Sequence, residues 1–176
     1  RHYRVCSSSH AGASGTMNNF ASRMMMNILT KSAFEQGIQP DDLQGGSSDD
    51  YASALIPIDQ KRNLLDDIVS KAGACFLLQQ DAGVDYYKNS PCLSALLYKA
   101  TPEYLIQRWQ RLERYIHSEH YIHIISSTSN SFIVEHKSQN NTPPTLAEDM
   151  AVMGVLKSLL KQSGAIQVQL DAVAEP

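Results

Sequence analysis

The stretch of sequence that decides the fold begins at Thr101 and ends at Gly164: TPEYLIQRWQRLERYIHSEHYIHIISSTSNSFIVEHKSQNNTPPTLAEDMAVMGVLKSLLKQSG. Its opening pair, Thr101-Pro102, places a hydroxyl at a helix N-cap and a proline at the first helical position. Apolar side chains then recur at helical spacing, at Leu105, Trp109, Leu112 and Ile116. This pattern predicts an amphipathic helix with one face turned to a core.

A hairpin and a second helix are predicted to follow. Residues 120–127 and 132–137 have the composition of two strands, and Ser129-Asn130 forms the polar turn between them. After two prolines, the run Thr145-Leu146-Ala147-Glu148 is typical of a capping box. It opens a long amphipathic helix that we expect to end near Gly164. The decisive stretch is therefore helix, hairpin, helix.

The rest of the chain adds further helices and one strand. An apolar run at residues 75–78 is followed by a predicted polar loop. Capping residues and apolar spacing predict helices over residues 18–36 and 59–72 and from Ser90-Pro91 onward. A helical turn is predicted at 40–43 and a loop at 45–50. A strand is predicted over 165–170, with Ile166, Val168 and Leu170 on one side. We therefore predict an α+β fold, with several amphipathic helices around a small, mainly antiparallel sheet that includes the hairpin near 120–138.

The first sixteen residues differ from the remainder of the chain. Residues 1–16 are rich in serine, glycine and alanine and have no apolar periodicity, so we expect a disordered leader or a segment introduced by cloning. Residues 17–176 are predicted to form a single domain, because 176 residues suffice for one core and no hinge is evident.

Composition narrows the functional classes. The net charge is −3 and the pI is near 6.1, so the basic excess of an autonomous nucleic-acid binder is missing. The three cysteines, Cys6, Cys75 and Cys92, are too scattered for a zinc site or a disulfide framework, and we expect buried free thiols in a reducing cytoplasm. No stretch approaches the roughly 20 apolar residues that cross a bilayer, so no membrane partner is expected.

No motif makes a case for catalysis. A nucleophile elbow, a phosphate-binding glycine loop, a dinucleotide fingerprint and a His-Glu-x-x-His zinc motif are all absent from the sequence. We therefore expect a protein that is not an enzyme and that needs no cofactor.

Histidines are the one chemical cluster of the sequence. If Thr128 pairs with Ser131 across the turn, counting back places His123 opposite His136, close enough to share an ion, and places His120 on the other face. A metal or haem site, a polar pocket and simple exposure to water all remain open interpretations. If the Val134 face of the hairpin packs inward, His136 is buried and needs a partner.

Aromatic side chains gather in the same region. Tyr115 and His123 are the expected partners of His136, and with Trp109 they make up the candidate ligand contacts: Trp109, Tyr115, His123 and His136. An arginine stripe runs along the same helix, at Arg108, Arg111 and Arg114. The residues fit equally well with a small-molecule pocket and with an ordinary core that has polar edges.

Several segments, in this order, carry a resemblance to a known family. They are residues 107–118 (QRWQRLERYIHS), 132–138 (FIVEHKS) and 143–149 (PPTLAED), preceded by 37–41 (GIQPD) and 56–59 (IPID). Together they resemble the N-terminal effector-binding region of AraC/XylS-type transcription regulators, in the branch called arabinose-binding-like. The resemblance covers residues 18–170.

The resemblance implies a sensor of small molecules. In this family the N-terminal domain binds an effector and often mediates dimerisation, while a separate C-terminal domain contacts DNA through helix-turn-helix motifs. Only residues 171–176 follow the last predicted strand, so this chain is expected to reach DNA only through a domain that it does not contain. The implied partners are a small-molecule effector of unspecified identity and a second copy of the chain.

Two alternatives belong to other functional classes. The broad apolar surface of the long helix at residues 145–162 would suit a protein–protein interaction module without a ligand pocket, although such a helix is more often simply buried. The histidines would suit a metal or haem sensor.

Overall fold

The computed structural model describes residues 20–39, 55–116, 120–128, 130–138 and 142–171. The helices and the two small antiparallel sheets, β1–β2 and β3–β4, confirm the predicted α+β class. In chain order the elements are β1 (Phe20–Ser22), α1 (Arg23–Glu35), β2 (Leu55–Pro57), α2 (Ile58–Ala72), the 3₁₀ helix η1 (Ala74–Leu78), α3 (Asp81–Tyr87), α4 (Pro91–Leu97), α5 (Pro102–Ile116), β3 (His120–Ser127), β4 (Phe132–Ser138) and α6 (Leu146–Gln162).

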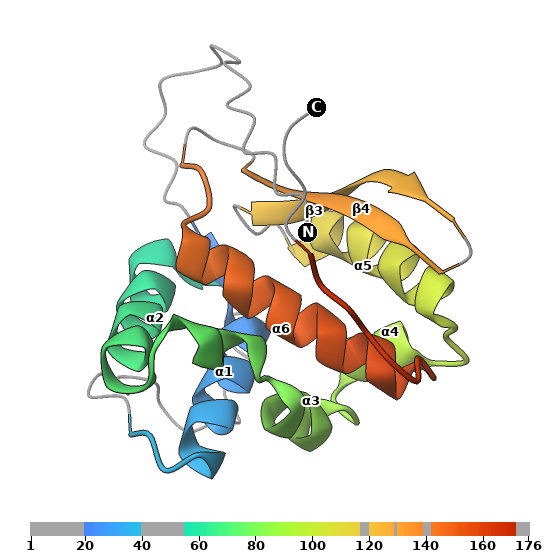
Figure 1. Ribbon diagram of the computed structural model, residues 1–176. Coiled ribbons are helices and arrows are strands. Elements are labelled where there is room, and N and C mark those ends of the chain that lie inside the picture. The colour runs from blue at the N-terminus through green and yellow to red at the C-terminus, as the bar shows by residue number, and fades with distance from the viewer. Residues whose placement is uncertain (1–19, 40–54, 117–119, 129, 139–141, 172–176) are drawn as a thin grey trace.

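Helix α6 runs across the molecule and packs against several other elements (Figure 1). Its predicted capping box is confirmed, because the Glu148 N–H donates to Thr145 Oγ1 and the Thr145 N–H donates to Glu148 Oε1, each at 3.2 Å. From Ala151 to Leu160 every side chain except Lys157 is buried. A helix that is covered all round is the centre of a core.

Two glycines allow helices to touch at backbone distance. A Cβ on Gly154 of α6 would lie 2.3 Å from the carbonyl oxygen of Leu77 in η1. A Cβ on Gly83 of α3 would lie 2.2 Å from the carbonyl oxygen of Ile28 in α1, and the Gly83 N–H donates to Ser32 Oγ at 2.9 Å. Any larger residue would push these elements apart.

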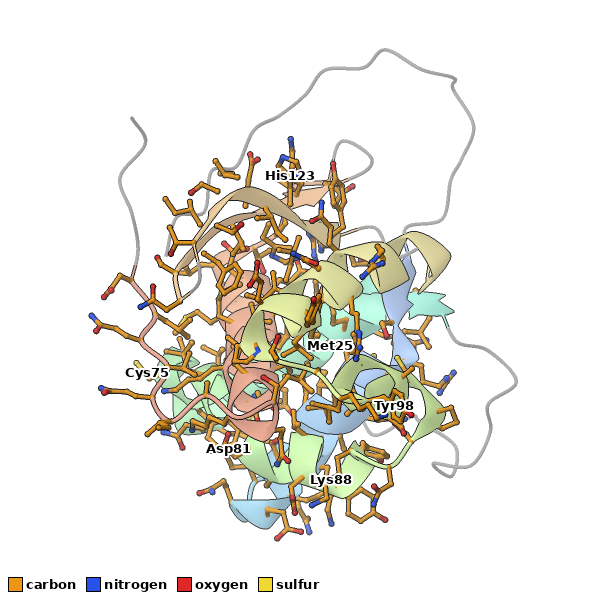
Figure 2. The ribbon with its side chains drawn as sticks, turned by 90° about the vertical axis from the view of Figure 1, so that its right-hand side faces the viewer. Met25, Cys75, Asp81, Lys88, Tyr98 and His123 are labelled. Carbon is orange, nitrogen blue, oxygen red and sulfur yellow. The ribbon has the colours of Figure 1, made fainter. Side chains whose placement is uncertain are left out.

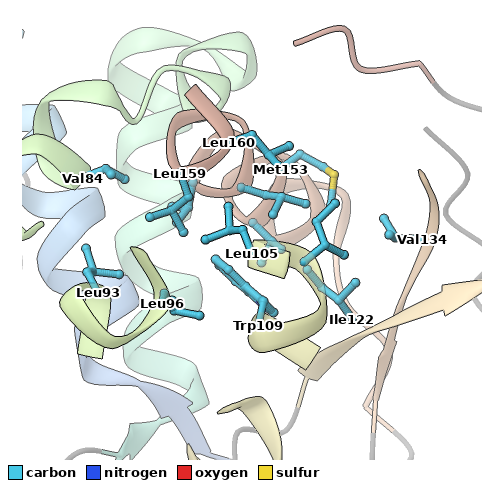
Figure 3. Close-up of a cluster of buried hydrophobic side chains, with 14 of the residues drawn as sticks. Val84, Leu93, Leu96, Leu105, Trp109, Ile122, Val134, Met153, Leu159 and Leu160 are labelled. Atoms are coloured by element: carbon cyan, nitrogen blue, oxygen red, sulfur yellow. The ribbon is translucent and has the colours of Figure 1, made fainter. Parts of the chain in front are cut away.

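The buried apolar side chains form two clusters on different faces of α6. One cluster joins α4, α5, the hairpin and α6, and Figure 3 shows Leu105 and Trp109 within it, near Leu159. The second cluster joins α1, α2, η1 and α6, and includes Leu65 and Leu77. Because both clusters share α6, the fold has one continuous framework around this helix.

The N-terminal helix starts later than predicted. Helix α1 begins at Arg23, since Ser22 is its N-cap and its Oγ accepts from the Met25 N–H at 3.5 Å. The preceding residues form β1, in which Phe20 lies opposite Pro57 of β2. Strand β2 leads directly into α2, so Asp59 lies in the first turn of that helix and not at its N-cap.

Three predictions are wrong here: that a polar loop follows residue 78, that Cys75 is buried and that Cys92 is buried. The apolar run at 75–78 forms η1, and the expected polar loop contains α3. Cys75 is exposed, because the short 3₁₀ turn directs Phe76 and Leu77 inward instead. Cys92, at the start of α4, is half-buried.

The predicted C-terminal strand does not form. Residues 165–170 are irregular, and Ile166 is fully exposed while Ala165, Val168 and Leu170 pack against the first cluster. Among the described residues no strand pairs with this segment, so no sheet imposes alternation on it. The predictions for residues 1–16, 40–43 and 45–50 lie outside the described residues.

Candidate ligand-binding site

The hairpin carries the histidines, and a β-bulge decides which of them point inward. The predicted turn is confirmed at its base, where the Thr128 N–H donates to the Ser131 carbonyl at 2.8 Å. Ser126 lies opposite Ile133 and Ile124 lies opposite Val134, so one residue of β3 is left over between them. Such a bulge reverses the faces of all residues beyond it.

The bulge overturns the predicted histidine pair. His123 lies opposite Glu135 and is exposed on the outer side of the hairpin (Figure 2). His120 shares the inner face with His136, and their ring centroids are 5.5 Å apart at an interplanar angle of 77°. As predicted for a hairpin packed on its Val134 face, His136 is buried, with 1% of its surface exposed.

A cavity lies beneath this inner face, between the hairpin, α1, α2, α4, α5 and α6. Its volume is about 80 Å³. Apolar side chains form most of its wall, among them Ile28, Leu93, Leu96, Trp109 and Val155. Four polar side chains interrupt that wall: Ser22, and the neighbouring Lys61, His120 and His136.

Sulfur-containing side chains complete the wall. Met24 and Met25 of α1 are half-buried and line the cavity, as does Cys92 of α4. Methionine is flexible and polarisable, so it adapts to molecules of different shape. The α1 side of the cavity is therefore its most adaptable side.

A second hollow, with a volume of about 730 Å³, lies between β4, α5, α6 and residues 165–171. Its polar lining residues, which include Asn130, Gln167 and Asp171, are exposed. A binding site needs polar groups that are held in place to orient a ligand. We therefore take the smaller cavity as the candidate site.

His136 is held by a carboxylate of α6 and not by the expected His123. Its Nδ1 lies 2.7 Å from Asp149 Oδ1. Burial lowers the pKa of His136 below its ordinary 6.5, and the opposing influence of Asp149 is smaller. The ring is therefore neutral at pH 7, with its proton on Nδ1 directed at Asp149.

His120 is held at both ring nitrogens. Its Nδ1 lies 3.0 Å from Glu148 Oε2 and 3.4 Å from Lys61 Nζ, and its Nε2 lies 2.8 Å from the carbonyl oxygen of Thr142. These contacts fix the orientation of the ring, so His120 acts as a rigid part of the wall.

Glu148 lies at the centre of a polar cluster that it forms with Lys61, Arg62 and His120. Its side chain is fully buried, and Lys61 Nζ lies 2.6 Å from Oε2 while Arg62 Nε donates to Oε1 at 2.9 Å. Burial alone would raise the pKa of this carboxyl, but His120 and Lys61 outweigh burial and hold the pKa well below its usual range. Glu148 is therefore ionised at all ordinary pH values.

The charges beside the cavity balance one another. Glu148 and Asp149 supply two carboxylates, and Lys61 and Arg62 of α2 supply two cations. Arg62 also donates to the carbonyl oxygen of Pro143, which ties α2 to the segment before α6. Buried charges are stable only when they are paired in this way.

Two of the four predicted ligand contacts line the cavity. These are Trp109, which is 8% exposed, and His136. His123 points away from it, and the side chain of Tyr115 lies outside the described residues. The arginine stripe has a structural role at Arg108, which donates to the carbonyl oxygens of Leu96 and Tyr98.

Sequence reasoning missed the partners of the histidines. Glu148 was recognised only as a capping residue, and Asp149 beside it carried no separate signal. Lys61 is the polar residue that interrupts the buried face of α2, one turn before Leu64 and Leu65. A lysine on an apolar helical face is a signal of a buried ion pair, and it would have pointed to this group.

The described residues offer little support for the metal alternative. No group of three or more His, Cys, Asp or Glu side chains among them could hold a metal ion.

Within the same ranges, no helix combines the length and the apolar character that a membrane span requires. Searches of family models, curated proteins and solved structures find no match to this chain, so the AraC resemblance stays a prediction.

Stability should fall as the pH drops below about 6.5. In the folded state the pKa of His136 is lowered from 6.5, because burial and the neighbouring His120 and Lys61 outweigh the attraction of Asp149. Between the two pKa values the unfolded chain binds more protons, so lower pH favours unfolding, by at most about 1.4 kcal/mol per pH unit for one proton. Urea unfolding at pH 7.5, 6.5 and 5.5 measures the slope.

An exposed histidine provides the control for this pH dependence. His123→Gln should keep the slope of the parent chain, whereas His136→Gln should reduce it between pH 6.5 and 5.5. Identical slopes in all three proteins would show that His136 does not cause the pH dependence.

Proposed function

We propose that this chain is a ligand-sensing domain of an AraC-type transcription regulator, which binds a small molecule without transforming it. The observation that carries the proposal is the cavity under the hairpin, in which an apolar wall meets the fixed side chains of His136, His120 and Lys61. An apolar cavity with a few oriented polar groups is the usual form of a small-molecule site.

The position of the cavity suits a sensor. Its wall draws on α1, α2, α4, α5, the hairpin and α6, which are distant in sequence. A ligand that contacts all of these elements stabilises their packed arrangement and shifts the population toward it. Under this proposal a homodimer and a separate DNA-binding domain would carry that shift to DNA.

Helix α6 gives no support to the interaction-module alternative. The apolar surface that motivated it faces both core clusters, with Val152 and Val155 in the first and Ala151 in the second. The large apolar residue of α6 that is exposed to solvent is Leu146, which lies at the start of the helix. A dimer, if this chain forms one, would therefore use another surface.

Thermal unfolding in the presence of sugars, amino acids, fatty acids and aromatic compounds tests the proposal. A ligand at about one hundred times its Kd stabilises the native state by about 2.7 kcal/mol, which raises the Tm of a chain of this size by roughly 5–10 °C. We expect at least one compound of the panel to raise the Tm with increasing concentration.

Two cysteine variants locate the binding site. Cys92→Leu adds side-chain volume to the cavity wall, whereas Cys75→Leu makes the same chemical change at an exposed position. The Tm increase should be lost in Cys92→Leu and kept in Cys75→Leu. The proposal fails if no compound raises the Tm, or if Cys92→Leu responds as the parent chain does.

A further inference from the structure

His136 brings one hydrogen-bond acceptor to the cavity. Its Nδ1–H is committed to Asp149, so the lone pair of the neutral ring lies on Nε2. The hydrogen bonds of the described residues include none to Nε2, although the ring is buried and lines the cavity. An acceptor that faces a cavity and has no protein partner favours a molecule that donates to it.

We infer that the ligand is a compact, uncharged alcohol or phenol whose hydroxyl group donates a hydrogen bond to Nε2 of His136. This inference rests on the proposed function and specifies the chemical class of the molecule that is sensed. It follows from the acceptor on His136, the size of the cavity and the balance of charge around it.

The size of the cavity limits the ligand. The cavity volume of about 80 Å³ is smaller than the roughly 150 Å³ of a dry apolar cavity that takes up benzene, so only a compact ligand fits. A single ring fits when the adaptable side chains of Met24 and Met25 move outward. The wall beside it is formed by Trp109, Leu93 and Leu96, which suit an apolar ring.

The balance of charge excludes a charged head group. Lys61 Nζ is already 2.6 Å from Glu148 Oε2, so it is not free to neutralise a ligand carboxylate. Such a carboxylate would also face the lone pair of His136, with the anionic Asp149 behind it. An ammonium group would leave water for an apolar wall that already contains the cation of Lys61. The carboxylate would lack a donor, and the ammonium would have a neutral acceptor but no counter-ion.

Phenol, toluene and benzoate form a matched set of probes. Phenol and toluene have nearly the same shape, and only phenol can donate to Nε2, whereas benzoate carries the excluded charge. Calorimetric titration of the full chain at pH 7.5 should give a phenol affinity roughly 10- to 100-fold above that of toluene. Benzoate should show no binding.

A double variant removes the acceptor together with its partner. His136→Phe with Asp149→Leu leaves no buried carboxylate unpaired and keeps a flat ring in the wall. Phenol should lose its advantage over toluene in this variant. In the unaltered chain, nitrogen-15 NMR of the imidazole gives a second measurement, because phenol should shift the Nε2 resonance of His136 and toluene should not.

The outcomes separate this inference from the proposed function. Equal affinities for phenol and toluene, both abolished by Cys92→Leu, would refute the inference and leave the cavity as a binding site. The inference is also refuted if a compound of the larger panel binds in the cavity while phenol does not. If neither the probes nor the panel bind, both proposals fail.

Discussion

Glu148→Ala is expected to reduce the free energy of unfolding by about 3–5 kcal/mol, the usual cost of removing one partner from a buried ion pair. The substitution would leave Lys61 and Arg62 of α2 without the carboxylate that lies 2.6 and 2.9 Å from them. It would also break the capping box of α6, because Glu148 Oε1 accepts from the Thr145 N–H. Urea unfolding at pH 7 measures the loss.

Glu103→Ala is the matched control for this prediction. Glu103 also lies in the first turn of a helix that is capped by a threonine, but its side chain is exposed. It should cost less than about 1 kcal/mol, the range of exposed charges near a helix N-terminus. Similar losses in Glu103→Ala and Glu148→Ala would show that the buried ion pairs do not stabilise the fold.

Gly154→Ala is expected to destabilise the protein by about 1–3 kcal/mol, although alanine is the better helix former by about 1 kcal/mol. The new Cβ would lie 2.3 Å from the Leu77 carbonyl oxygen and 2.9 Å from the Leu78 Cα. Both are backbone atoms, so η1 would have to move away from α6. Thermal and urea unfolding both detect such a loss.

An exposed helical position calibrates the effect. Ser70→Ala on α2 changes helix propensity without a steric conflict, and should be neutral or slightly stabilising. A Gly154→Ala protein that is at least as stable as its parent would mean that α6 and η1 are not in backbone contact.

Helix ends could be predicted because their signals are local. The hydroxyl groups of Thr145, Ser90 and Thr101 each accept the expected hydrogen bond from a backbone N–H three residues later. Such signals depend on a few neighbouring residues and need no knowledge of the rest of the fold. The beginning of α1 was missed because its cap, Ser22, follows a short strand that depends on the distant residue Pro57.

The composition of the site depends on distant contacts and was only partly predicted. The burial of His136 followed from strand alternation once the Val134 face was taken as the inner face. Its pairing with Asp149 and that of Lys61 with Glu148 join residues from separate elements. No local pattern reports which elements become neighbours, so sequence reasoning supplied half of the site.

The bulge in β3 decides which histidine of that strand faces inward. Whether His120 or His123 faces the cavity depends on the parity of the residue count between each histidine and the turn, corrected by the one residue that the bulge absorbs. A substitution in β3 leaves this parity unchanged. Insertion of one residue between His123 and the bulge would reverse it.

Removal of Ile125 would be the exception, because Ile124 opposite Val134 and Ser126 opposite Ile133 would then form a continuous ladder that keeps His120 beside His136. The number of residues in β3 therefore decides which histidine faces the cavity. Within β3, residue 125 is the position at which that number can change without loss of the site.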